Sequence, residues 1–104
     1  MNVEITNELI YWRGPSPFHF VTVPARESKA LRESAAEITY GWGVLPTTAT
    51  IGETEFTTSL FPKDGLYLVP VKVKVRRAEG LELGDIVTVR MEFDLERGTK
   101  QSLR

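Results

Sequence analysis

The chain has 104 residues, with 13 basic and 14 acidic side chains, one histidine and no cysteine. This length fits a single domain that buries a core without disulfide bonds. The missing cysteine excludes a disulfide framework, a thiolate zinc site and a cysteine nucleophile, and it is typical of a cytoplasmic protein. The first residues lack a leader pattern and no apolar run approaches the roughly 18 residues of a membrane span, so we expect no membrane partner.

The formal net charge is −1, but the basic residues are unevenly placed. Residues 66–77 contain no acid, whereas the other 92 residues carry nine basic against 14 acidic side chains. The basic residues of this segment are Lys72, Lys74, Arg76 and Arg77. We interpret them as a solvated face that pairs with Glu79 and Glu82, and the acidic remainder makes nucleic acid an unlikely partner.

Strands dominate the pattern along the chain. Apolar residues of one parity between Val3 and Tyr11 predict a half-buried strand, and residues 18–23 predict a strand that is covered on both faces. Pro24 favours a helix over residues 25–36. Gly41-Trp42-Gly43 is typical of a loop. Gly52-Glu53 predicts a type II′ turn in a hairpin of residues 44–51 and 54–61.

The C-terminal part alternates most regularly. Val87, Val89, Met91, Phe93 and Leu95 share one parity, with charged or hydroxyl side chains between them. This pattern predicts a strand with one buried face. Residues 98–104 are expected to form a frayed tail.

The segment from Val71 to Val75 gives two conflicting signals. Its β-branched residues alternate with lysines, which favours a strand. Yet it follows Pro70, and Gly80 beyond it is typical of the left-handed residue that ends a helix. From the residues alone, both interpretations stay open.

The second half of the chain contains a series of short motifs. They are Thr58-Ser59-Leu60-Phe61-Pro62, Gly65, Tyr67, Val69-Pro70-Val71-Lys72, Val75-Arg76, Gly80-Leu81 and Gly84-Asp85. This series resembles a bacterial family named domain of unknown function 1905. Trp12, Gly14, Phe20-Val21 and Gly41-Trp42-Gly43 fit the same family. The likeness therefore spans residues 3–95.

The resemblance implies a fold. The family is similar to double-split β-barrels such as the AbrB and MazE type DNA-binding proteins, in which a strand and a proline lead into a short helix. It therefore implies a mainly β barrel over residues 1–97, closed by short helices at 25–36 and 71–79. A weaker copy of the motif begins at Pro24, which implies two pseudo-equivalent halves in one chain.

Candidate site residues are few, and none forms a catalytic group or a metal site. Trp12 and Trp42 lie near glycines at predicted strand ends, where an aromatic ring either seals the barrel or lines a cleft. His19 is the only histidine, which excludes a multi-histidine metal site and favours a structural or cleft-lining role over that of a catalytic base. Lys72 or Arg76 would bring a cation to this cleft.

Other polar residues have a simpler structural explanation. Ser59 lacks the glycine-flanked turn that exposes a nucleophile and is expected in a ladder. Glu92, Asp94 and Glu96 could hold a hard cation, but alternating carboxylates on a final strand are typical of a solvated face.

Three function classes follow. The first is a non-enzymatic binding or accessory module without a cofactor, which holds a small or peptide-like anionic ligand at one barrel end. The second, by analogy with AbrB-like barrels, is DNA binding through the basic segment. The third is an enzyme that uses His19 with Arg76 or Ser59. We also expect a monomer or a weak homodimer.

Overall fold

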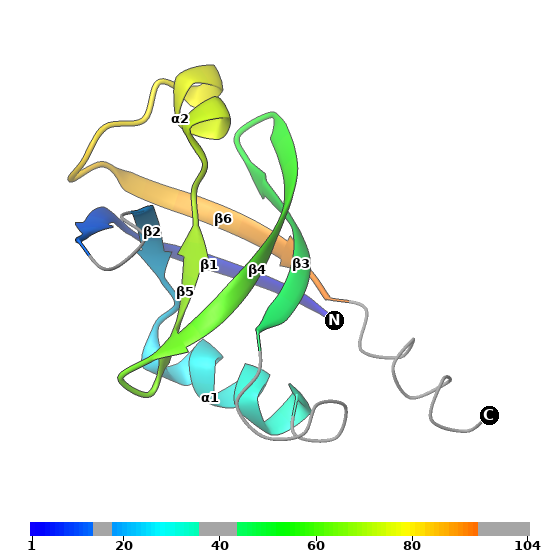
Figure 1. Cartoon of the computed structure of the whole chain (residues 1–104). Coiled ribbons are helices and arrows are strands. Elements are labelled where there is room, and N and C mark those ends of the chain that lie inside the picture. Colours follow the sequence, from blue (N-terminus) through cyan, green and yellow to red (C-terminus); the bar gives the residue numbers. More distant parts are fainter. Residues whose placement is uncertain (14–17, 36–43, 94–104) are drawn as a thin grey trace.

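The computed structural model describes residues 1–13, 18–35 and 44–93, and these form a closed antiparallel barrel of six strands with two helices (Figure 1). The strands follow the order β1-β2-β5-β4-β3-β6 around the barrel. The elements are β1 (Asn2–Trp12), β2 (Phe18–Thr22), α1 (Ala25–Ala35), β3 (Leu45–Ile51), β4 (Thr54–Lys63), β5 (Leu66–Pro70), α2 (Val73–Glu79) and β6 (Ile86–Glu92).

Two long strands each belong to two sheets. In β1, residues 2–8 pair with β6 and residues 9–12 pair with β2. In β4, residues 54–60 pair with β3 and residues 61–63 pair with β5. The barrel therefore has one wall of β1-β6-β3-β4 and one wall of β1-β2-β5-β4, as the double-split arrangement predicts.

The two halves of the chain are related by a pseudo-two-fold axis. Exchanging β1 with β4, β2 with β5 and β3 with β6 reproduces the same order of strands around the barrel. The main chain repeats this relation at a spacing of 48 residues. The Val23 N–H donates to the Tyr67 carbonyl at 2.8 Å, and the Val71 N–H donates to the His19 carbonyl at 2.9 Å. The predicted internal repeat is confirmed.

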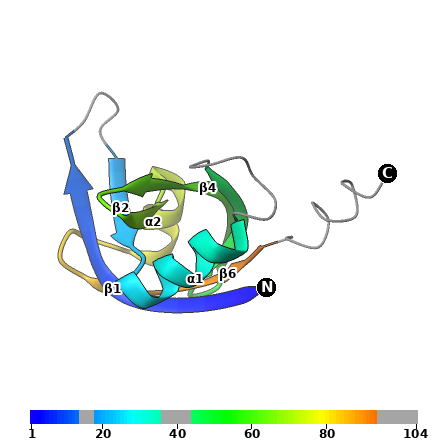
Figure 2. The same ribbon diagram turned by 90° about the horizontal axis from the view of Figure 1, so that it is seen from below.

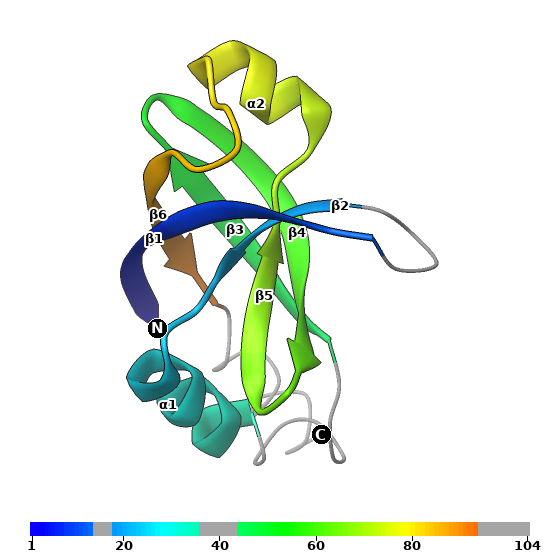
Figure 3. The same cartoon turned by 90° about the vertical axis from the view of Figure 1, so that its left-hand side faces the viewer.

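The helices occupy equivalent places in the two halves. α1 follows β2 and lies across one end of the barrel, and α2 follows β5 and lies at the opposite end (Figures 2 and 3). Neither described helix is long and apolar enough to cross a membrane.

The main core fills the barrel, because alternate residues of each strand point inward. In β6, for example, Val87, Val89 and Met91 are buried and the residues between them are exposed. β2 and β5 are also covered on their outer faces, since Phe20 is 0% exposed and Leu68 is 4% exposed. The prediction of a strand covered on both faces is confirmed for β2.

The conflict at residues 71–75 is resolved by burial. Val71 and Val75 are buried four positions apart, whereas Val73 is 49% exposed. A strand would have placed all three on one face. The segment does not continue as a strand. The helix begins at Val73 rather than at Val71, because Lys72 keeps an extended backbone with φ −69° and ψ 155°.

Two glycines take the positive φ values that the sequence predicted, one at the end of α2 and one in the turn between β3 and β4. Gly80 ends α2 in the left-handed conformation, with φ 63° and ψ 38°, and the next N–H, that of Leu81, donates to the Arg76 carbonyl at 2.9 Å. Gly52 takes φ +59°, which suits the first central position of a type II′ turn. The predictions for Gly41-Trp42-Gly43, for Leu95 and for the tail at 98–104 lie outside the described residues.

Candidate functional site

The predicted site residues do not gather in one pocket. Trp12 and Phe20 lie on the outer face of the β1-β2-β5-β4 wall, where their ring centroids are 6.2 Å apart. His19 has the opposite parity in β2 and pairs with Tyr11. Trp42 lies outside the described residues. The structure therefore separates Trp12 from His19.

His19 belongs to the barrel end that α2 covers. Its half-buried ring packs edge-on against the ring of Tyr11, with centroids 5.1 Å apart. Desolvation by burial lowers the pKa of His19, and the positive charge of Arg76 lowers it further. The neutral imidazole is thus favoured, which suits a packed aromatic ring more than an anion-binding group.

Two cations of the basic segment are bound to the main chain. The Arg76 Nε–H donates to the Val71 carbonyl at 3.3 Å, and the Lys72 ammonium donates to the Thr57 carbonyl at 3.0 Å. The expected pairing with Glu79 and Glu82 is wrong, because neither carboxylate forms an ion pair within the described residues; that of Glu79 accepts the Thr54 hydroxyl at 2.5 Å. The ion pairs of the described residues include Arg26–Glu27 and Lys63–Asp64.

Trp12 has a different cation beside it. The Lys63 ammonium lies 4.9 Å from the centroid of the Trp12 ring. Trp12 also packs near Phe61, with centroids 6.4 Å apart, and Phe61 packs edge-on against Phe20 at 5.0 Å. We call Trp12, Phe20 and Phe61 the aromatic cluster.

A groove of about 260 Å³ lies beside the aromatic cluster. Its walls are mostly apolar, and its charged groups are Lys63 and Asp64, whose side chains pair at 2.9 Å. Its lining residues are Ile10, Tyr11, Trp12, Thr22, Lys63, Asp64, Leu66 and Leu68. We call this hollow the aromatic groove.

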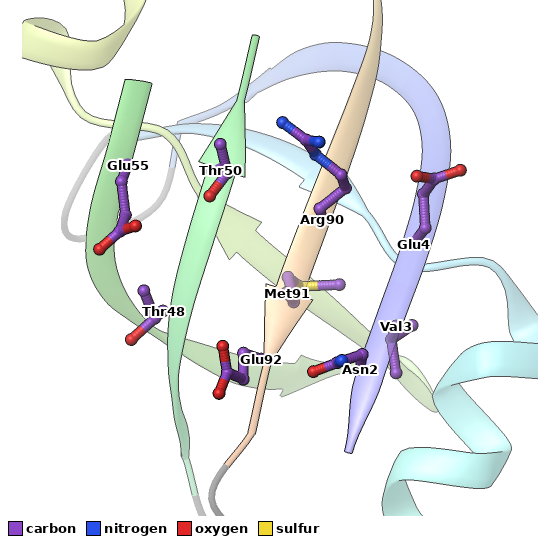
Figure 4. A pocket seen from close by; sticks show the side chains of 9 residues that line it. All are labelled: Asn2, Val3, Glu4, Thr48, Thr50, Glu55, Arg90, Met91 and Glu92. Carbon is purple, nitrogen blue, oxygen red and sulfur yellow. The ribbon is translucent and has the colours of Figure 1, made fainter. Parts of the chain in front are cut away.

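A second hollow, of about 460 Å³, lies on the outer face of the β1-β6-β3-β4 wall (Figure 4). The register places Glu4, Arg90, Thr50 and Glu55 in one row across four strands. The guanidinium of Arg90 donates to the Gly52 carbonyl at 3.0 Å. With Glu92 also in the lining, this polar cleft carries three carboxylates against one guanidinium, which disfavours an anion.

Comparison with family models places the chain in a known family. A family model described as Domain of unknown function (DUF1905) matches residues 6–91. The chain belongs to this family. No curated protein matches it.

Part of the candidate site of this DUF1905 protein was not predicted from the sequence. Trp12 was predicted, whereas Lys63 and Phe61, which lie about 50 residues further along the chain, were not. The contact of Trp12 with Phe20 could have been predicted, because residues 12 and 20 both have even numbers and the register of β1 with β2 places such residues on one face. The contact of Lys63 with Trp12 had no such pattern in the sequence, since it depends on the pairing of β4 with β5 in the wall that contains Trp12.

Proposed function

We propose that this DUF1905 protein is a non-enzymatic binding module, whose aromatic groove holds a small or peptide-like anionic ligand. The observation that carries the proposal is the Lys63 ammonium over the Trp12 ring at the edge of an apolar groove. The site thus keeps Trp12 from the sequence prediction. It replaces Lys72 and Arg76 with Lys63 as the cation.

The chemistry of the groove supports a carboxylate attached to an apolar group. Ile10, Leu68 and Trp12 offer apolar contact, and Lys63 offers one positive charge that orients the ligand. The side chain of Asp64 is 83% exposed, so an incoming carboxylate can take its place on Lys63 at little cost.

An enzyme using His19 is less well supported. Ser59 pairs with Pro46 in the β3–β4 ladder, whereas His19 pairs with Tyr11 in the other wall of the barrel. The two side chains therefore come from different sheets, and a base must lie within hydrogen-bond reach of its nucleophile. We further propose a cytoplasmic protein that is a monomer or weak homodimer and needs no cofactor.

DNA binding is the alternative that α2 suggests. Because Lys72 and Arg76 already donate to main-chain carbonyls, mainly Lys74 and Arg77 are available to phosphates. We expect only weak, salt-sensitive contact. Submicromolar binding of duplex DNA at physiological salt, lost when Arg76 and Arg77 are both replaced by alanine, would favour the alternative.

The proposal is tested by thermal-shift screening with aromatic carboxylates, aliphatic carboxylates and acidic dipeptides. A ligand that stabilises the wild-type protein should lose its effect in Lys63→Met, which keeps an unbranched side chain of similar length but removes its charge. Lys74→Met on the exposed surface of α2 is the matched control and should respond like the wild type. Equal responses of both variants would refute the assignment of Lys63.

A further inference from the structure

The two halves of the chain are joined by one two-residue turn. Residues 2–51 contain β1, β2, α1 and β3, and residues 54–92 contain β4, β5, α2 and β6. We propose that this chain can exchange entire halves with a second copy of itself, using Gly52-Glu53 as the hinge. Each barrel of the resulting dimer would combine the first half of one chain with the second half of the other.

The register of the hairpin permits this exchange. β3 and β4 pair without interruption from Leu45↔Leu60 to Ile51↔Thr54, directly up to the turn. If the turn opens, β3 and β4 become one continuous strand that can pair with the same strand of a second copy. Gly52 then lies opposite Glu53 of the partner subunit, and all seven existing pairs form again between the chains.

The rest of the barrel is conserved in the exchange, because the same residues meet in both forms. Contacts between the halves, such as β2 with β5 and β1 with β6, depend on which residues meet and not on which chain supplies them. The closed and exchanged forms therefore differ mainly in the hinge and in the entropy of association. A turn at Gly52 therefore favours the closed form, and an extended backbone at Gly52 favours the exchanged form.

The turn is built for glycine. Gly52 has φ +59°, a backbone conformation that strains any residue with a β-carbon, and a β-carbon there would also displace the carboxylate end of Glu79. That carboxylate accepts a hydrogen bond from the hydroxyl of Thr54. A β-branched residue at position 52 thus opposes the closed turn, while it favours the extended hinge of the exchanged form.

The main test is the mass of Gly52→Val in solution, measured by light scattering after size exclusion. We expect about twice the 11.7 kDa of a single chain, with the circular dichroism of the wild type. Gly65→Val is the matched control, because Gly65 also has positive φ, +80°, but its turn lies inside one half. We expect this control to remain monomeric.

A disulfide reporter identifies which strands have exchanged, and the natural chain has no cysteine to interfere. Thr50 and Glu55 face each other one step from the turn, so Thr50→Cys with Glu55→Cys links one chain to itself in the closed form. In the exchanged form the same pair links two chains. A second pair, Lys63→Cys with Leu66→Cys, stays within one half and must remain intrachain in both forms.

The outcomes separate clearly on a non-reducing gel. Interchain linkage at positions 50 and 55 in Gly52→Val supports the exchange, and a folded monomer with intrachain linkage overturns it. Should Gly52→Val not fold, the reporter without that substitution is refolded at increasing protein concentration. A rising interchain fraction supports the proposal, and intrachain linkage at every concentration overturns it.

Discussion

The first and second halves of the barrel share a backbone plan but differ where each helix meets its strand. Ser28 in α1 is 1% exposed, and its hydroxyl donates to the Val23 carbonyl at 2.9 Å and accepts the Tyr67 N–H at 3.0 Å. At the equivalent position, 48 residues later, Arg76 in α2 donates to the Val71 carbonyl at 3.3 Å. The same main-chain acceptor is thus satisfied by a buried hydroxyl in one half and by a half-exposed cation in the other.

The two ends of the barrel differ accordingly. Tyr67, the counterpart of His19, is 3% exposed beneath α1, and its burial raises its pKa although Arg32 opposes the shift. His19 lies half-buried near Arg76 at the end that α2 covers. A repeated backbone therefore does not require repeated chemistry, and the α1 end is the more completely sealed of the two.

The largest expected effect comes from comparing substitutions on the outer faces of β2 and β5. Phe20→Ala should lower the free energy of unfolding by about 3–5 kcal/mol, because the ring is fully buried between Trp12 and Phe61. Leu68→Ala at the equivalent position should cost less, since it removes a smaller side chain that lines the aromatic groove. Urea unfolding measures both losses, and equal losses would contradict a larger contribution of Phe20 and the aromatic cluster to stability.

The next effect compares Ser28 with Arg76. Ser28→Ala leaves the buried Tyr67 N–H and Val23 carbonyl without this hydroxyl, which should cost about 1–3 kcal/mol. Arg76→Ala should cost less than about 1 kcal/mol, because water can reach the Val71 carbonyl once the half-exposed side chain is removed. If the order of the two losses were reversed, the α2 end would be the better sealed one.

A smaller effect concerns the end of α2. Gly80→Val should lower the free energy of unfolding by more than about 1 kcal/mol, since a β-branched residue is strongly disfavoured at φ 63°. Gly80→Asn is the control, because asparagine tolerates this conformation. An unchanged melting temperature in Gly80→Val would be incompatible with the left-handed end of the helix.

The smallest effect is the pH dependence due to His19. Its pKa is lowered in the folded protein, so the unfolded chain binds the proton more tightly. This contribution to stability is present above the ordinary pKa of 6.5 and is lost as the pH falls through the lower folded value. His19→Gln should therefore lose less stability than the wild type between about pH 8 and about pH 5.

The two causes of the lowered His19 pKa, burial and the charge of Arg76, can be separated by the same titration. NMR titration of the imidazole should give a pKa below 6.5 in the wild type. Arg76→Ala should raise this pKa only partly, because burial is the larger cause and the guanidinium the smaller. A full return to 6.5 would show that Arg76, rather than burial, controls His19.

The sequence alone determined those features whose causes are local. The alternation of Val87, Val89, Met91 and Phe93 predicted β6 and its buried side, because a strand repeats every two residues. Gly52 and Gly80 predicted a turn and a helix end, because positive φ is available to glycine at low cost. The resemblance added the barrel and the internal repeat, both of which the structure confirms.

The tertiary structure decided what depends on residues far apart in the chain. Val71 to Val75 alternates like a strand, yet a helix begins at Val73 and buries Val75 against the barrel, since packing outweighs a weak local preference. Trp12 and His19 looked like partners in sequence, but the register of β1 with β2 places them on opposite faces. Lys63 reaches Trp12 only because β4 and β1 are each shared by the two walls of a closed barrel, and no local pattern encodes that contact.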